Sequence, residues 1–228
     1  MANEFEIRPI AYIYNDFSSK FGIPRQSGLC DVFSEIVFEK DFRCDEALRE
    51  IDEYSHLWLI WQFSESVTQE FRPTVRPPRL GGNKRVGVFA TRSPFRPNSL
   101  GLSCVKLEEV KKVPGKGSVL IVSGADLKNG TPIFDIKPYL TLSDCHPEAV
   151  CGFSDAVREY ELTPAIPDKL IEKIAPKKRD AVIAILKNDP RPSYHSDDER
   201  EYGFEFGEYE IKFRVKGNNI TVTDVICK

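Results

Sequence analysis

The residues best suited to chemistry in this chain lie in one short loop, within residues 87–102. Arg92 and Arg96 offer planar guanidinium groups with several N–H donors, Ser93 offers a hydroxyl and Asn98 an amide. Two prolines restrict the backbone of the loop, and loops at strand ends often display functional polar groups on a rigid scaffold. The loop therefore predicts a site for a carboxylate or a phosphate. The alternative is a turn whose polar groups only form hydrogen bonds within the turn.

The loop belongs to a longer stretch, residues 71–107, that contains eight lysines and arginines and no acidic residue, although the chain has 35 Asp and Glu residues. This stretch contributes +8 to a net charge of −3 and leaves −11 on the rest of the molecule. A positive field on an otherwise acidic protein suits a polyanionic partner. Single loop arginines often only solvate a surface, but a cluster of this kind indicates a nucleic-acid or phosphate site. We expect its contacts to the polyanion to come from Arg72, Arg76, Arg79, Arg85 and Arg96.

Two further segments carry polar groups. Residues 72–83 form a proline-rich strip with an arginine every three or four positions, which could follow a phosphate backbone, and the sequence has no G-x-G-x-x-G fingerprint of a Rossmann cofactor site. Residues 124–139 contain Asp126 and Asp135, which are either turn residues or groups that bind an amine or accept a proton. His56 lies in an apolar run, and we expect a hydrogen-bonded core residue there rather than a base.

Length and composition limit the class of protein. With 228 residues, 41% hydrophobic and 29% charged, the chain can form one large domain or a medium and a small one, and is expected to be soluble. The longest apolar run, residues 56–63, is too short to cross a bilayer, and the first residues contain no apolar signal segment, so we expect a cytoplasmic protein without a membrane partner. Six cysteines without a C-x-x-C pair, together with three histidines, predict no metal site.

The first 145 residues are dense in short apolar runs rich in β-branched and aromatic residues. The predicted strands are residues 5–14, 36–39, 57–63, 86–91, 100–107, 119–123 and 132–136. One short helix is predicted from Asp45 as N-cap, with Leu48 and Ile51 on one face. Closely spaced strands without helices between them favour an antiparallel sheet that closes into a β-barrel and exclude a doubly wound parallel sheet.

The pattern changes after about residue 153. Pro167 is expected to open a helix that Pro176 ends, and residues 177–188 repeat the helical period. Residues 209–215 alternate in polarity, and a turn at residues 217–219 leads into a second alternating run, which predicts a hairpin. The fold class is therefore mainly β, with a barrel domain at residues 1–152 and a small α+β domain at residues 153–228.

Six blocks of this sequence resemble the TsaA-like family, and most closely its full-length bacterial TrmO-type members. The blocks occur in the family's order over essentially the whole chain, at residues 24–29, 54–59, 72–83, 87–102, 135–139 and 189–192. The resemblance implies a methyltransferase that uses S-adenosylmethionine and acts on N6-threonylcarbamoyladenosine at position 37, in the anticodon loop of tRNA. It also implies a single-sheet β-barrel outside the Rossmann class, and a homodimer.

The same resemblance assigns the cofactor to Gln26, Ser27, Gly28, Leu29, Arg92, Leu102, Ser123, Gly124, Ala125 and Asp126. It identifies no general base, and the catalytic residue is unknown. In the modified base N6 lies between a purine ring and a carbonyl, so its hydrogen is more acidic than that of adenine and orientation could supply most of the acceleration. The threonyl carboxylate of the modification calls for an arginine. Two alternatives stay open: a non-catalytic RNA-binding module, and an enzyme for a small phosphorylated metabolite.

Three details accompany the resemblance. Ser99 replaces a proline that the family usually has, and a serine is expected to loosen the loop. Phe95 is either a ring that stacks on an RNA base or a buried core residue. The polar loop of residues 189–192, with Tyr194 and His195, predicts that the C-terminal domain assists RNA binding, the alternative being a structural cap.

Overall fold

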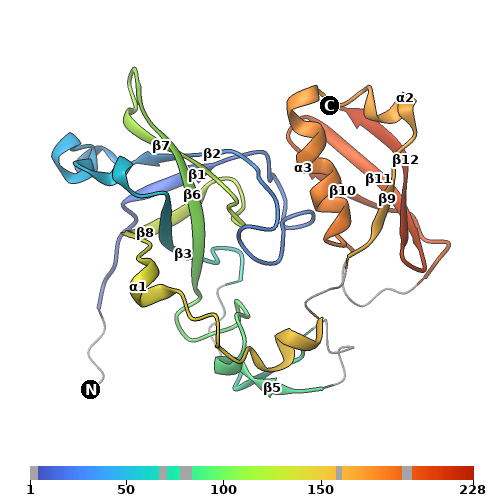
Figure 1. Ribbon diagram of the computed structural model, residues 1–228, viewed down its shortest axis with the longest axis horizontal. Coiled ribbons are helices and arrows are strands. Elements are labelled where there is room, and N and C mark those ends of the chain that lie inside the picture. Colours follow the sequence, from blue (N-terminus) through green and yellow to red (C-terminus); the bar gives the residue numbers. More distant parts are fainter. Residues whose placement is uncertain (1–4, 67–70, 78–83, 158–160, 192–196) are drawn as a thin grey trace.

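The computed structural model describes residues 5–66, 71–77, 84–157, 161–191 and 197–228 (Figure 1). Six antiparallel strands form the N-terminal sheet in the order β1-β2-β7-β6-β3-β8, and β8 pairs back with β1, which closes the sheet into a barrel. These strands are β1 (Ala11–Tyr14), β2 (Ser34–Phe38), β3 (His56–Gln62), β6 (Leu100–Val113), β7 (Gly117–Ser123) and β8 (Thr131–Pro138). The prediction of a mainly β, antiparallel fold is confirmed, although β1 covers only the end of the predicted first strand.

Alternation along the strands fills the barrel. Leu57, Leu59 and Trp61 of β3 are buried, while the residues between them are only half-buried, because successive side chains of a strand point to opposite faces. They pack with buried residues of the other strands, such as Ile13 and Leu120, in one hydrophobic cluster. This core holds the strand ends from which the loops with the predicted site residues leave.

A two-stranded ribbon and several short helices lie outside the barrel strands. The ribbon pairs β4 (Thr74–Val75) with β5 (Val86–Gly87), and the predicted strand of residues 86–91 turns there into the 3-10 helix η5 (Val88–Ala90). The other short elements are η1 (Lys40–Phe42), η2 (Asp45–Leu48), η3 (Ile51–Glu53), α1 (Thr141–Asp144) and η6 (Gly152–Val157).

The C-terminal residues form a second sheet with a separate hydrophobic cluster, which also includes residues from the segment between β1 and β2. The sheet has the order β10-β11-β12-β9, with β9 parallel to β12, and packs against α3, in orange in Figure 1. Its elements are β9 (Thr163–Ala165), α2 (Asp168–Ile171), α3 (Pro176–Lys187), β10 (Tyr202–Phe206), β11 (Tyr209–Lys216) and β12 (Asn219–Cys227). The predicted hairpin is confirmed as β11 and β12.

Two predicted helices are wrong in detail. The residues after Asp45 form two separate 3-10 turns, because Glu50 between them adopts a left-handed conformation with φ of 66°. Asp45 caps neither turn; its carboxylate instead accepts hydrogen bonds from Lys112 and Ser118. Pro176 was predicted to end a helix, but it is the first residue of α3, where its missing N–H costs no hydrogen bond.

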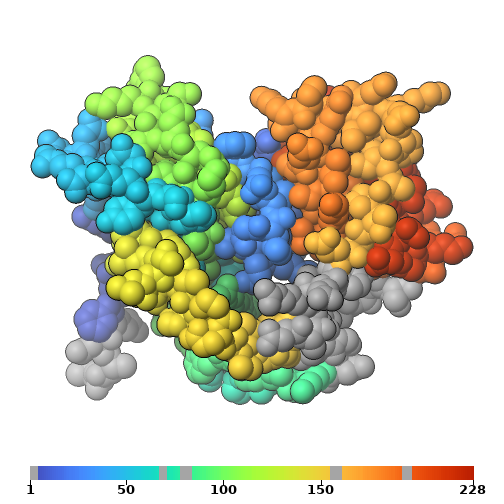
Figure 2. Space-filling model, in the orientation of Figure 1, coloured from blue at the N-terminus to red at the C-terminus, as the bar shows by residue number. Residues whose placement is uncertain are grey.

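The segment between β1 and β2 connects the two halves of the molecule. Phe17, Cys30 and Val32 are buried in the C-terminal cluster rather than in the barrel core. The Gly207 amide donates to the Asp16 carbonyl at 2.8 Å. In Figure 2 this blue segment fills the space between the barrel and the orange α3. Among the described residues, no helix has the length and apolar character needed to cross a membrane.

Candidate functional site

Two glycines join the predicted cofactor segments. Gly28 and Gly124 have φ angles of 78° and 80°, a region that residues with a side chain rarely adopt. The Gly28 amide donates to the Gly124 carbonyl at 2.8 Å. A Cβ added to Gly124 would lie 3.4 Å from the backbone of Gly28, so it would fill the space between the two loops. The structure therefore brings together the predicted sets of residues 26–29 and 123–126.

Arg92 reaches this junction from the arginine loop. Its Nη1 atom donates to Oε1 of Gln26 at 2.6 Å. Thr91 fixes the backbone before and after it: the Thr91 hydroxyl donates to the Val88 carbonyl at 2.8 Å and accepts the Ser93 amide at 3.2 Å. The side chain of Arg92 is exposed and, among the described residues, forms no ion pair. The site thus offers a guanidinium group held in position for an anion.

Asp126 supplies the opposite charge and belongs to a partly buried network. Trp61 Nε1 donates to the Ser103 hydroxyl at 2.9 Å, and that hydroxyl donates to Asp126 Oδ1 at 2.5 Å. Burial raises the pKa of Asp126, while the bond from Ser103 and the charge of Arg92 act against this rise. Burial disfavours the charged form of an unpaired carboxylate, and a nearby positive charge favours it. A cationic ligand group would therefore bind favourably next to Asp126. Trp61 and Ser103 were not among the predicted site residues.

The remaining predicted cofactor residues contribute in different ways. Leu29 and Leu102 are exposed apolar side chains, and the amide of Cys104, next but one to Leu102 on β6, donates to the Ser27 hydroxyl at 3.2 Å. Ala125 is buried in the barrel core. The Ser123 hydroxyl is buried and donates to Glu108 at 2.6 Å, so Ser123 and Ala125 present only their backbone to a ligand.

The predicted RNA-binding arginines fall into two groups. Arg72, Arg76 and Arg85 are exposed on the β4–β5 ribbon and its flanks. Arg96 is half-buried, and its Nη1 atom donates to the Thr91 carbonyl at 2.8 Å, so it braces its own loop. Arg79 lies outside the described residues.

Three expectations about single residues change. His56 is exposed, and its ring contacts the Ser55 hydroxyl, so the prediction of a core histidine is wrong. Phe95 is exposed, which excludes the buried-core alternative. Ser99 was expected to loosen the loop, but it is buried and its amide donates to the Arg96 carbonyl at 3.2 Å, a bond that proline could not form.

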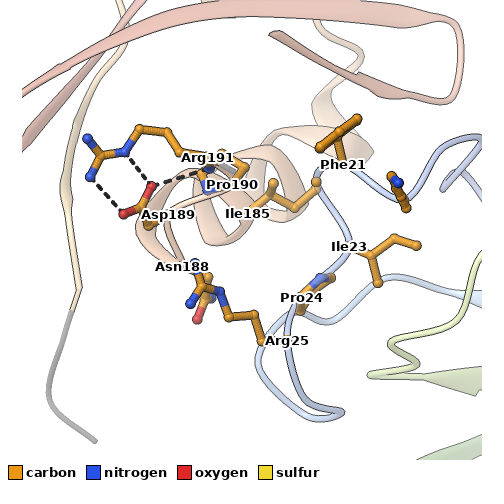
Figure 3. A pocket seen from close by; sticks show the side chains of 11 residues that line it. Phe21, Ile23, Pro24, Arg25, Ile185, Asn188, Asp189, Pro190 and Arg191 are labelled. Atoms are coloured by element: carbon orange, nitrogen blue, oxygen red, sulfur yellow. Dashed lines mark hydrogen bonds and ion pairs between the residues drawn. The ribbon is translucent and has the colours of Figure 1, made fainter. Parts of the chain in front are cut away.

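A pocket of about 160 Å³ lies between residues 20–25 and the end of α3 (Figure 3). At its edge Asp189, which is 8% exposed, accepts two hydrogen bonds of 2.8 Å from Nε and Nη2 of Arg191. The side chain of Asn188 donates to the Leu29 carbonyl at 3.2 Å, which links this pocket to the cofactor loop. Of the predicted C-terminal RNA-binding residues, Pro192, Tyr194 and His195 lie outside the described residues.

The barrel carries an arginine and a carboxylate at one loop junction, and the chain also has an acid-free cationic strip, residues 71–107; such a site suits a small zwitterionic ligand and a polyanion. Comparisons with known proteins give the family. A family model described as the tRNA-methyltransferase O N-terminal domain matches residues 12–145, and one for the TrmO C-terminal domain matches residues 161–227. The tRNA (adenine(37)-N6)-methyltransferase of Escherichia coli K12 is 37% identical over 223 residues, which cover 93% of this chain and 94% of that protein.

The protein of the same name from Eikenella corrodens is 42% identical over 164 residues, covering 72% of this chain and 92% of that protein. A crystal structure of TrmO from Pseudomonas aeruginosa matches with a TM-score of 0.81 at 28% identity, covering 100% of this chain and 99% of that one. The chain therefore belongs to the tRNA-methyltransferase O family. This membership confirms the predicted family, the prediction of a tRNA methyltransferase and S-adenosylmethionine as its cofactor.

The residues at the junction fit this cofactor chemically. S-adenosylmethionine supplies a methyl group bound to a positively charged sulfur, and it also carries a carboxylate, an amino group and an adenosine. Arg92 matches the carboxylate and Asp126 the amino group, because each offers the opposite charge. The exposed side chains of Leu29 and Leu102 can cover apolar parts of the adenosine. The planar guanidinium group of arginine matches the geometry of a carboxylate better than the ammonium group of a lysine does.

Proposed function

We propose that this protein methylates N6 of N6-threonylcarbamoyladenosine at position 37, in the anticodon loop of tRNA. The observation that carries the proposal is that one acid-free stretch of sequence, residues 71–107, contains both Arg92, which donates to Gln26, and the exposed Arg72 and Arg76. A polyanion that binds along these residues would extend toward the loop that carries Arg92. The names of the relatives from Escherichia coli and Eikenella corrodens support adenine 37 as the target base.

In this proposal the chain contributes orientation rather than a strong base. N6 of the modified adenosine is acidified by its neighbouring carbonyl, so its proton can leave to solvent as the new N–C bond forms. Arg92 and Asp126 hold the carboxylate and the amino group of the cofactor's methionyl part, and the bond to Gln26 keeps the guanidinium in place. Correct alignment of two reactants can supply a large part of a barrier reduction. The threonyl carboxylate of the substrate would bind an arginine of the cationic strip.

The proposal includes the assembly. We infer a cytoplasmic homodimer with a cofactor-binding barrel domain outside the Rossmann class at residues 1–152, and a domain at residues 153–228 that assists RNA binding. Two separate hydrophobic clusters support two domains, and the two family models end and begin at residues 145 and 161, on either side of the proposed boundary. The pocket beside Asp189 supports the RNA role, because it lies next to the cofactor loop.

The substrate is tested with two pools of tRNA, one with and one without the threonylcarbamoyl group on adenosine 37. The purified protein and S-adenosylmethionine are incubated with each pool, and the nucleosides are measured by mass spectrometry. We expect one methyl group on the modified adenosine and none on the unmodified one. Equal methylation of both pools would show that the threonylcarbamoyl group is not recognised.

The RNA surface is tested by changing Arg72 and Arg76 together to alanine. Because each phosphate contact releases about one counterion, the slope of log affinity against log salt should fall by roughly two, while cofactor affinity stays near the wild-type value. An equal loss of both affinities would assign these arginines to the fold or to the cofactor.

A further inference from the structure

Two exposed phenylalanine rings stack on each other beside the arginine loop. The ring centroids of Phe71 and Phe89 are 6.1 Å apart and the ring planes meet at 25°. The two residues nevertheless keep 56% and 71% of their surface exposed. Neither belongs to one of the two hydrophobic clusters. Exposed apolar surface of this kind indicates contact with another molecule rather than a structural role.

The backbone holds the two rings in place. The Val88 amide donates to the Pro73 carbonyl at 3.0 Å, so the hydrogen bonding of the β4–β5 ribbon continues toward Phe71 and Phe89. Val88 is 1% exposed and anchors the turn, and the Thr91 hydroxyl donates to its carbonyl at 2.8 Å. The rings therefore project from a supported turn, and little ordering is needed before they bind a ligand.

The charges around the rings select the class of partner. The guanidinium carbon of Arg96 lies 5.9 Å from the Phe89 ring centroid, and its bond to the Thr91 carbonyl keeps it there. Arg72 and Arg85 are exposed on the ribbon that supports the rings, and no acidic residue occurs between residues 71 and 107. Aromatic faces interleaved with arginines are typical of surfaces that bind unpaired nucleotides, where bases stack and phosphates meet the cations.

We propose that the Phe71–Phe89 pair is a stacking platform for an unpaired nucleobase of the RNA substrate, beside the base that is methylated. The occupant is a base of the anticodon loop, with its flanking phosphates on the neighbouring arginines. The inference rests on the proposed function for the identity of the RNA. The platform goes beyond that function, because it binds a base other than the one that is methylated.

The test uses Phe89→Ala, Phe89→Trp and a control, Phe33→Ala, which removes a ring with a similar exposure of 64% elsewhere. The probe is a synthetic RNA hairpin with an anticodon stem and loop, bound at several salt concentrations. Loss of one base–aromatic stack weakens binding by roughly 5-fold to 100-fold, so we expect this loss for Phe89→Ala. Because no phosphate contact is removed, the salt slope should stay unchanged. Phe89→Trp should bind like the wild type, and so should Phe33→Ala.

A second arm locates the base. Loop nucleotides of the hairpin are replaced one at a time by abasic nucleotides. At the position that stacks on Phe89 the wild type should lose affinity, and Phe89→Ala should then cause no further loss, since both changes remove the same contact. Wild-type affinity of Phe89→Ala for the intact hairpin would overturn the platform. A change of oligomeric state in Phe89→Ala, measured by analytical ultracentrifugation, would also overturn it and assign the rings to a contact between two copies of the chain.

Failure of this inference and failure of the proposed function are distinguishable. If the wild type methylates tRNA at the threonylcarbamoyl base while Phe89→Ala binds RNA normally, only the platform is refuted. If the wild type binds the hairpin through Phe89 but transfers no methyl group to any tRNA, the platform stands and the proposed reaction is refuted.

Discussion

Replacing Ser103 with alanine should weaken both the fold and the cofactor site. Ser103 is 1% exposed, and its hydroxyl donates to Asp126 at 2.5 Å and accepts from Trp61 at 2.9 Å. A hydrogen bond to a charged group contributes about 1.5–3 kcal/mol, and a buried donor left without a partner costs about 1–3 kcal/mol. The two effects overlap, because one hydroxyl serves both partners. We therefore expect the free energy of unfolding to fall by about 2–4 kcal/mol.

Ser34 provides a matched control in the same sheet. It is 2% exposed, and its hydroxyl has no hydrogen-bond partner among the described residues. Ser34→Ala removes the same atom without breaking a bond, so the free energy of unfolding should change by no more than about 0.5 kcal/mol, or rise slightly. Urea unfolding followed by tryptophan fluorescence measures both variants. Equal losses for the two serines would refute the reasoning that the network, rather than burial of a hydroxyl, stabilises the barrel.

The cofactor side of this prediction concerns pH. The hydrogen bond from Ser103 holds down the pKa of Asp126, which burial raises, so Ser103→Ala should raise that pKa further. A smaller fraction of Asp126 is then ionised at a given pH, and the variant should need a higher pH than the wild type to reach its full affinity for S-adenosylmethionine. Calorimetric titrations over a pH series measure this shift. An unchanged profile would mean that the cofactor does not use the charge of Asp126.

Three further predictions concern other parts of the molecule. Arg92→Lys keeps the charge but loses the planar fork, so kcat/KM should fall roughly 10-fold or more, about 1.4 kcal/mol, at nearly unchanged stability, and a variant that unfolds instead would make Arg92 structural. Gly101→Ala would place a Cβ 2.3 Å from the Trp61 ring, so urea unfolding should show a loss of about 1–3 kcal/mol in the free energy of unfolding; wild-type stability would show that the ring can move aside. The hydrogen bond from Lys178 lowers the pKa of Glu208 from 4.5 to about 2, so this carboxylate adds stability above pH 4.5 and loses it as the pH falls toward 2. Thermal unfolding of Glu208→Gln should depend less on pH in this window, and an identical acid profile would contradict the pairing.

The strands were predictable where side chains alternate strictly. Tyr209, Ile211 and Phe213 alternate with polar residues, and this alternation indicated β11. Tyr202 and Phe204 show the same period, so β10 could have been predicted in the same way. β9 was out of reach, because three residues that include a proline carry little signal of their own. Its strand character comes from pairing with β12, more than fifty residues later in the chain. Such non-local pairing is not encoded in any short window of sequence.

The loops of the site could be predicted from the sequence, but the hydrogen-bond network that supports them could not. The resemblance pointed to the segments around Gly28, Gly124 and Arg92, and the structure brings these together. A tryptophan and a serine in two different strands form no sequence motif. Trp61 pairs with Gly101 across β3 and β6, and only the absence of a side chain there lets the indole lie over the strand and reach Ser103. That relation depends on strand register, which the sequence alone did not specify.

The cofactor loop is synthesised well before the residues in and just after α3 that hydrogen-bond to it. The Leu29 carbonyl accepts from Asn188, a residue 159 positions later, and the Cys30 thiol donates to the Ala181 carbonyl of α3. At a translation rate of about 5–20 residues per second, the loop leaves the ribosome roughly 10–30 seconds before the residues that secure it. A fragment released early would carry barrel strands but a cofactor loop that lacks both bonds. Prematurely terminated chains would therefore compete poorly for S-adenosylmethionine with the finished protein.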